Sequence, residues 1–170
     1  EPVRKYGSPE LAAEVLPRVA AGELHVAFGV TEPDAGTDTT QIKTRAVRDG
    51  DEYVINGAKV WTTKAPYCEM CLLLVRTTPI EECESRTDGI SLFLVDLQDP
   101  AVDITPIPKL GRNAVVSCEV RYDNLRVPAS RRIGDEGKGF RYILDGLNPE
   151  RVLIATEALG KGVWFRAPAI

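Results

Sequence analysis

Residues 28–38 read FGVTEPDAGTD, and they form the most informative stretch of the chain. The apolar run from Leu24 to Val30 predicts a strand, which ends in a loop of small and turn-forming residues. Gly36 allows a ligand to approach the backbone closely, and the hydroxyls of Thr31 and Thr37 can bind a phosphate or the edge of a flat heterocycle. An ordinary connecting loop has the same composition, so the residues alone leave both interpretations open.

Residues 55–63 form a second informative stretch, which reads INGAKVWTT. Asn56-Gly57 predicts a tight turn. Trp61 and Thr63 lie two apart on the strand expected after it, so they should share one face. A flat apolar ring beside a hydroxyl suits a planar heteroaromatic cofactor, whereas the alternative is a tryptophan of the core.

Short apolar runs separated by turn residues surround these stretches. Asp49-Gly50 predicts a hairpin, and the polar segment 78–88 predicts an exposed loop. The expected strands are 24–30, 42–48, 52–55, 59–63, 69–77, 90–95, 102–107 and 115–122. With no helical pattern between them, these strands favour a mainly β fold, an antiparallel sandwich or barrel, over a parallel α/β sheet.

A helical segment is expected before the strands. Ser8 followed by Pro9 predicts a helix start, and Gly22 can end the helix in the left-handed conformation. Pro17 should kink or divide the helix. The expected apolar stripe consists of Leu11, Val15 and Val19.

A second helical segment is expected after Gly134–Gly139, with Pro149 interrupting it and Ala155–Leu159 ending soon after it starts. Its apolar face needs a surface to cover, which predicts a truncated piece of a larger helical assembly. The expected domains are residues 1–23, the end of an N-terminal helical domain; 24–133, a β middle domain; and 134–170, the start of a C-terminal helical domain.

The composition suits one globular domain, with 170 residues of which 44% are hydrophobic and 27% charged. A net charge of −4 argues against a broad nucleic-acid footprint, and the apolar runs are too short to span a membrane. The N-terminus has no apolar signal-peptide region and no Met, which predicts a processed or excised chain that is not secreted.

The four cysteines are Cys68, Cys71, Cys83 and Cys118. Cys68 and Cys71 form a C-x-x-C, a pattern found in metal and redox sites. Cys71 begins an apolar run typical of a buried strand, on which residues three apart point to opposite faces. There is no second C-x-x-C, and His25 is distant in sequence. We therefore predict free thiols in a reducing compartment and no metal site.

The two motifs resemble those of the acyl-CoA dehydrogenase family, T-E-P-x-A-G-[ST]-D and N-G-x-K-x-W-[IT]-[TS], here residues 31–38 and 56–63. The resemblance runs from Lys5 to about Gly160. Later matches are residues 89–95, 110–112, 127–128, 134–140 and 148–151. The resemblance implies a β middle domain that contacts FAD, within a chain that is a fragment of the whole enzyme.

The resemblance also implies roles for the first motif. Phe28, Val30 and Thr31 match positions that line the flavin ring, with Thr31 donating to its pyrimidine edge. Gly36 and Thr37 match positions near the pyrophosphate of FAD. Both residues also match positions near the pantetheine arm of the substrate.

Further roles follow for the second motif and the last helix. Trp61 resembles the ring that packs against the isoalloxazine, and Thr63 the hydroxyl bound to flavin N5, the hydride acceptor. Arg151 matches a contact to CoA, with a surface salt bridge as the alternative. Glu150 stands where a minority of the family places the catalytic base. The alternative is that the base lies beyond Ile170 and that Glu150 is a carboxylate at a helix start, where the helix dipole favours it.

The implied reaction is FAD-dependent α,β-dehydrogenation of an acyl-CoA thioester. The implied partners are an acyl-CoA substrate and an electron-transfer flavoprotein as acceptor, in a homotetramer or homodimer of the bacterial cytoplasm or mitochondrial matrix. The chain alone is expected to bind FAD weakly and to be inactive. The alternatives are a nucleic-acid-binding damage-response relative of the family, or a relative of the acyl-CoA oxidase or nitroalkane oxidase type.

Overall fold

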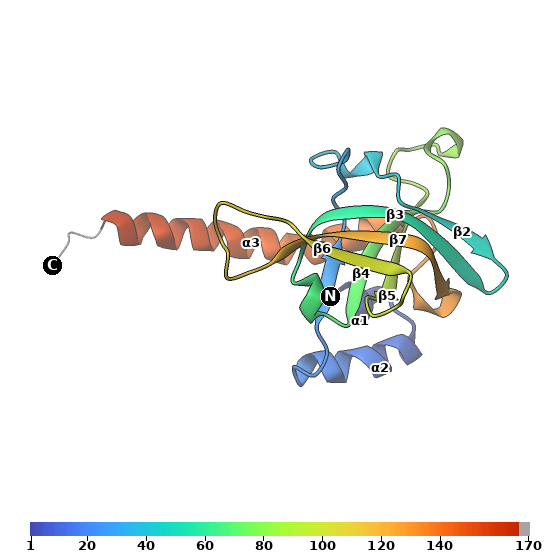
Figure 1. The fold of residues 1–170 in the computed structure, drawn as a ribbon, viewed down its shortest axis with the longest axis horizontal. Coiled ribbons are helices and arrows are strands. Elements are labelled where there is room, and N and C mark those ends of the chain that lie inside the picture. The colour runs from blue at the N-terminus through green and yellow to red at the C-terminus, as the bar shows by residue number, and fades with distance from the viewer. Residues whose placement is uncertain (167–170) are drawn as a thin grey trace.

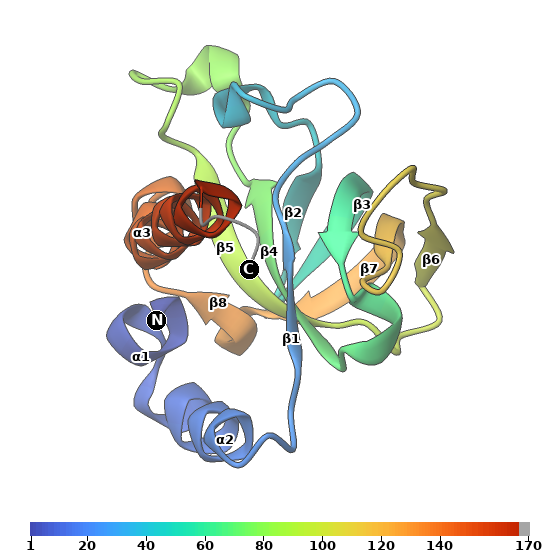
Figure 2. The same ribbon diagram turned by 90° about the vertical axis from the view of Figure 1, so that its left-hand side faces the viewer.

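A computed structural model describes residues 1–166 as a β body with helices on one side (Figures 1 and 2). Residues 167–170, the end of the domain predicted for 134–170, lie outside the described part. The helices are α1 (Pro2–Tyr6), α2 (Pro9–Ala20) and α3 (Gly139–Arg166). The strands are β1 (Val26–Gly29), β2 (Arg45–Asp49), β3 (Glu52–Thr63), β4 (Met70–Arg76), β5 (Ile90–Asp96), β6 (Val102–Pro106), β7 (Ser117–Pro128) and β8 (Arg132–Ile133). Short 3-10 turns are η1 (Thr39–Gln41), η2 (Ala65–Tyr67), η3 (Ile80–Glu82) and η4 (Ala129–Arg131).

The strands form one sheet in the order β6-β7-β3-β2-β4-β5-β8, with β1 paired to β4. Most pairs are antiparallel, as predicted. The exceptions are β1 with β4, and the single pair Arg45 with Arg76 that joins β2 to β4, which are parallel. The mainly β prediction is therefore confirmed, with a parallel strand that the sequence pattern did not indicate.

Strands β4 and β5 are buried on both faces, and this places two cores. On β4, Cys71, Leu73 and Val75 belong to a core enclosed by the sheet, together with residues of β3 and β7. Leu74 belongs to a second core, and Leu72 packs against it; this core lies between the sheet and the helices. Figure 2 shows α1, α2 and α3 gathered on the β5–β8 side of the sheet. Alternation along each strand thus yields a barrel-like interior and a helix-covered outer face.

Helix α2 begins as predicted, because the Ser8 hydroxyl accepts from the Leu11 amide at 3.1 Å. Gly22 follows its end with φ 73°, also as predicted. Val19 is 42% exposed, so its place in the apolar stripe was wrong. Pro17 lies inside one continuous helix, so a division there was also wrong. Helix α1 was not predicted.

Helix α3 runs through Pro149 without interruption, which corrects the predicted break and the predicted early end after Ala155–Leu159. A proline removes one helical hydrogen bond, but the helix continues where the bonds on both sides of it still form. Glu150 therefore lies in the middle of α3 rather than at a helix start. The alternative role at a helix start, favoured by the helix dipole, was wrong for this residue.

The turn predicted at Asn56-Gly57 was also wrong, because β3 continues through both residues. The pairing of β3 with β7 shifts register between Ile55 and Gly57. The Asn56 side chain accepts a hydrogen bond from the Asn124 amide at 2.9 Å across this irregularity. Gly57 has φ 149°, and a Cβ there would lie 2.5 Å from the Thr44 hydroxyl. A glycine is thus needed inside the strand for a bulge and a close approach, rather than for a turn.

The cysteines are all free, and Cys68 lies before β4 rather than on it. The prediction placed Cys68 and Cys71 on opposite faces of one strand. That prediction was wrong, because Cys68 lies outside the strand and both cysteines are buried in the same core cluster. Within residues 1–166, no group of three His, Cys, Asp or Glu side chains could hold a metal ion. Within the same range, none of the helices has the length and apolarity that a membrane crossing requires.

Candidate functional site

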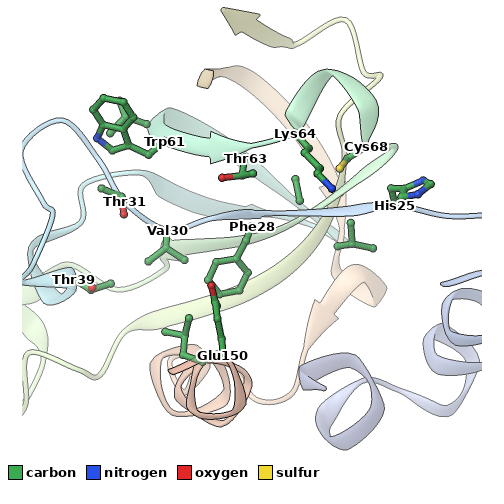
Figure 3. Close-up of a pocket in the computed structure, with 14 residues that line it drawn as sticks. His25, Phe28, Val30, Thr31, Thr39, Trp61, Thr63, Lys64, Cys68 and Glu150 are labelled. Atoms are coloured by element: carbon green, nitrogen blue, oxygen red, sulfur yellow. The ribbon is translucent and has the colours of Figure 1, made fainter. Parts of the chain in front are cut away.

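A cavity of about 660 Å³ lies between β1, the end of β3 and α3 (Figure 3). This volume is in the range of pockets that hold a drug-sized ligand or a cofactor ring. The lining residues are His25, Val26, Ala27, Phe28, Val30, Thr31, Thr39, Val60, Trp61, Thr63, Lys64, Cys68, Leu147 and Glu150. Six of the predicted site residues are among them: Phe28, Val30, Thr31, Trp61, Thr63 and Glu150.

A bulge in β3 turns Trp61 toward the cavity. The register with β7 shifts between Lys59 and Thr62, so β3 has an extra residue there. Trp61 has φ 62°, a left-handed conformation that a bulky side chain rarely adopts. Its side chain is 56% exposed, so the alternative of a core tryptophan was wrong. Thr63 lies on the same face as Trp61, as predicted, while Thr62 between them is buried.

Two hydroxyls of the cavity are available to a ligand. Within the described part of the chain, the side chains of Thr31 and Thr63 have no hydrogen-bond partner, and both line the cavity beside Trp61. Figure 3 shows Thr63 and Trp61 on one side of the β1 segment, with Thr31 close to Trp61. A flat apolar ring with two free hydroxyls fits the planar heterocycle that the sequence predicted, such as the flavin of FAD.

Helix α3 forms the opposite side of the cavity. Glu150 lines it, and Figure 3 shows its side chain pointing toward Phe28. Arg151 instead lines an adjoining cavity of about 180 Å³, together with Thr37. Within residues 1–166, Arg151 forms no ion pair, and its guanidinium donates to the Asn148 side chain at 2.9 Å. The alternative of a surface salt bridge is therefore wrong for Arg151 among the described residues.

The structure brings most of the predicted residues together, but not all. Val30, Thr39 and Leu147 line both cavities, so the two cavities lie next to each other. Gly36 lines neither cavity, and a Cβ at this position would meet no atom within 4 Å. The structure therefore supplies no packing reason for a glycine at position 36.

Several lining residues were missed by the sequence analysis. His25, Lys64 and Cys68 gather at the end of the cavity away from Trp61 (Figure 3). Lys64 directly follows the second motif, which could have indicated it. His25 precedes β1 by one residue, but nothing in its spacing marks it as part of a site.

Glu32 and Lys59 were given no role from the sequence, yet their side chains join the two motifs. The Lys59 ammonium donates to Glu32 at 2.8 Å, and the two side chains are 0% and 5% exposed. Burial lowers the pKa of Lys59 to about 8, against the opposing effect of Glu32. Burial works to raise the pKa of Glu32, but Lys59 and the amide donors hold that pKa below its usual value.

Comparison with known proteins gives a consistent result. The family described as "Acyl-CoA dehydrogenase, middle domain" matches residues 27–125. The acyl-CoA dehydrogenase FadE26 of Mycobacterium tuberculosis is 37% identical over 92% of this chain and 38% of its own length. The mitochondrial long-chain specific acyl-CoA dehydrogenase of Sus scrofa is 35% identical over 92% of this chain and 36% of its own length.

Solved structures show the same likeness. The crystal structure of an acyl-CoA dehydrogenase from Geobacillus kaustophilus has a TM-score of 0.86 and 34% identity. That match covers 91% of this chain and 40% of the other. This chain thus spans well under half of the length of the proteins it matches.

Proposed function

The chain belongs to the acyl-CoA dehydrogenase family, and from this premise we propose that the protein containing it oxidises an acyl-CoA thioester to the α,β-unsaturated product. Members of this family use FAD. In this proposal the chain supplies one wall of the flavin site, formed by β1 and β3. The observation that carries the proposal is the single cavity shared by Thr31, Trp61 and Thr63.

The β wall binds and orients the cofactor in this proposal. The Trp61 ring gives a flat apolar surface, and the free hydroxyls of Thr31 and Thr63 donate to polar atoms at the edge of the flavin. Phe28 and Val30 complete the apolar lining from β1. FAD, when bound, supplies the acceptor for the hydride that leaves the β carbon. Gly36 and Thr37 are proposed to lie near its pyrophosphate.

In this proposal the residues on the helix side of the cavity contact the substrate. Thr37 and Arg151 share the adjoining cavity, where the guanidinium suits the phosphates of CoA. Glu150 is a candidate for the base that removes the α proton, because it reaches the main cavity from α3. The alternative is a base outside this chain, in the C-terminal helical region typical of the family.

The proposed compartment, electron acceptor and assembly are based on the relatives. Those compared above are bacterial and mitochondrial acyl-CoA dehydrogenases, which supports the proposal that the protein acts in the bacterial cytoplasm or the mitochondrial matrix. An electron-transfer flavoprotein is the proposed acceptor, and a homotetramer or homodimer the proposed assembly. The proposed domain limits remain 1–23, 24–133 and 134–170.

Anaerobic reduction of the full-length protein tests the function. We expect a yellow protein, because oxidised flavin absorbs at about 450 nm. Addition of an acyl-CoA should bleach this absorbance. The matched control is the corresponding enoyl-CoA, which already carries the double bond and should not bleach it. A full-length protein that stays colourless after incubation with FAD, or a flavin that no acyl-CoA bleaches, would contradict the proposal.

A further inference from the structure

A buried ion pair contacts the backbone of the cavity lining and joins the two sequence motifs. Lys59 and Glu32 meet at 2.8 Å with almost no exposure to solvent. Removing two charges from water is costly, and an apolar pair of similar volume is often as stable or more stable. Stability alone therefore gives little reason for this pair, and its contacts to the cavity lining are more informative.

The first contacts run from β3 to the segment that follows β1. The Lys59 ammonium also donates to the Val30 carbonyl at 3.0 Å. The next residue along β3, Val60, donates its amide to the Thr31 carbonyl at 2.8 Å. Val30 and Thr31 both line the cavity. Two successive carbonyls of the lining are thus tied to β3 immediately before the bulge that turns Trp61.

The second contacts run from Glu32 to the segment before β2. Its carboxylate accepts the Lys43 amide at 2.6 Å and the Thr44 amide at 3.0 Å. One carboxylate therefore joins three separate segments, at residues 32, 43–44 and 59. Bonds between charged and neutral groups in a buried place are short and directional, so they fix the spacing of the segments they join.

An exposed ion pair nearby provides the contrast. Lys43 and Asp34 meet at 3.1 Å, but their side chains are 74% and 73% exposed. No other contact of the Lys43 ammonium is found within residues 1–166. Such a pair is screened by water and holds no backbone in place.

We propose that Glu32 and Lys59 are positioning residues, which set the spacing between the Val30–Thr31 segment and the Trp61–Thr63 segment so that a flat heterocycle fits between them. The proposal rests on the proposed function for the identity of that heterocycle, FAD. Neither side chain touches the ligand in this arrangement. Their effect on binding passes through the two carbonyls and through the bulge of β3.

The test uses the full-length protein, with FAD titrated into the apoprotein. The double variant Glu32→Gln/Lys59→Met removes both charges and leaves no unpaired buried ion. We expect its dissociation constant for FAD to rise at least about tenfold, as for the loss of one or two hydrogen bonds. At saturating FAD we also expect the flavin absorption band to lose resolved fine structure, a change that a purely structural role would not produce. The melting temperature of the apoprotein should fall only modestly, because one of the two amides that Glu32 accepts loses its acceptor.

Two further variants keep the proposal open to refutation. Glu32→Gln alone keeps the shape of the side chain, and its amide oxygen can still accept from the Lys59 ammonium, so it should fold with some loss of stability. Its dissociation constant should rise roughly threefold. Lys43→Met, at the exposed pair, should bind FAD like the wild type. Wild-type affinity and an unchanged flavin band in Glu32→Gln and the double variant would overturn the proposal, as would an equal loss in Lys43→Met. A wild-type protein that binds no FAD would instead overturn the proposed function, and this inference with it.

Discussion

The two walls of the cavity are held in place in different ways. On the β wall, buried bonds from Lys59 and Glu32 fix the backbone that carries the lining residues. On the helix wall, Ile143 is buried, but the apolar residues beyond Glu150 are exposed, with Leu153 at 69%. The β wall is thus specified by contacts within the chain itself. The helix wall depends on few such contacts where Glu150 reaches the cavity.

This difference separates cofactor binding from proton removal. A fixed wall with free hydroxyls suits the binding of a rigid ring. A carboxylate on an exposed stretch of helix can reach a substrate, but its environment in the described part of the chain does not hold it in one place. Variants on the two walls should therefore fail in different ways.

The largest effect is expected on the helix wall. If Glu150 is the base, Glu150→Gln should lower the rate of flavin reduction by an acyl-CoA by roughly 10²–10⁴-fold, as for the loss of general base catalysis, without loss of FAD. Stopped-flow reduction of the full-length protein measures this rate. Glu157→Gln is the matched control, because Glu157 lies on α3 outside the cavity and pairs with Arg112 at 3.5 Å. Equal rates in Glu150→Gln and the wild type would assign the base to another residue.

The next effect is expected on the β wall. Lys59→Met leaves Glu32 buried without its partner, so the free energy of unfolding should fall by about 3–5 kcal/mol. Chemical denaturation measures this change. Lys43→Met should change the same quantity by at most about 1 kcal/mol, since its pair with Asp34 is exposed. Similar losses in the two variants would show that burial of the pair does not matter.

The pH dependence of stability provides a further test of the buried pair of Lys59 and Glu32. Lys59 has a pKa lowered to about 8 from an unfolded value near 10.5, so the folded state releases this proton first. Between these two values the unfolded state binds more protons, and the free energy of unfolding should rise with pH from this group. Glu32 and Cys71 are the titratable groups that act on Lys59. Burial raises the pKa of Cys71 to about 12, which acts in the opposite direction in both proteins. Measured by denaturation, the free energy of unfolding of the wild type minus that of Glu32→Gln/Lys59→Met should therefore increase between pH 8 and 10.5.

A smaller effect is expected at the bulge of β3. Trp61 is exposed and has φ 62°, a conformation that costs a bulky residue about 1–2 kcal/mol. Trp61→Gly should therefore raise the free energy of unfolding by about 1 kcal/mol while weakening FAD binding. A loss of stability in this variant would show that Trp61 contributes packing that outweighs its backbone strain.

The sequence predicted the fold well where a local signal existed. Ser8 and Gly22 marked the ends of α2, and the alternation of apolar runs with turns identified most strands. It failed where tertiary pairing overrode the local preference. Asn56-Gly57 is a strong turn signal, but pairing with β7 carries β3 through it. Pro149 is a strong helix breaker, but α3 continues on both sides of it.

The sequence predicted some residues of the candidate site and missed others. The two motifs indicated Thr31, Trp61 and Thr63, which the fold brings to one cavity. Spacing could not show that Glu32 and Lys59 meet in the core, because they are 27 positions apart and charged residues are usually expected at the surface. The position of Glu150 opposite β1 depends on the packing of α3, which no local pattern encodes.

We propose that the β wall binds the flavin through the face that carries Thr63, and the adjacent residues Thr62 and Thr63 allow a direct test. Thr63 has a free hydroxyl at the cavity, whereas the Thr62 hydroxyl is buried without a partner among the described residues. In a titration of the full-length apoprotein with FAD, we predict that Thr63→Val binds about tenfold more weakly than the wild type, while Thr62→Val binds equally well. Wild-type affinity in Thr63→Val, or an equal loss in Thr62→Val, would show that the Thr63 hydroxyl does not bind the flavin.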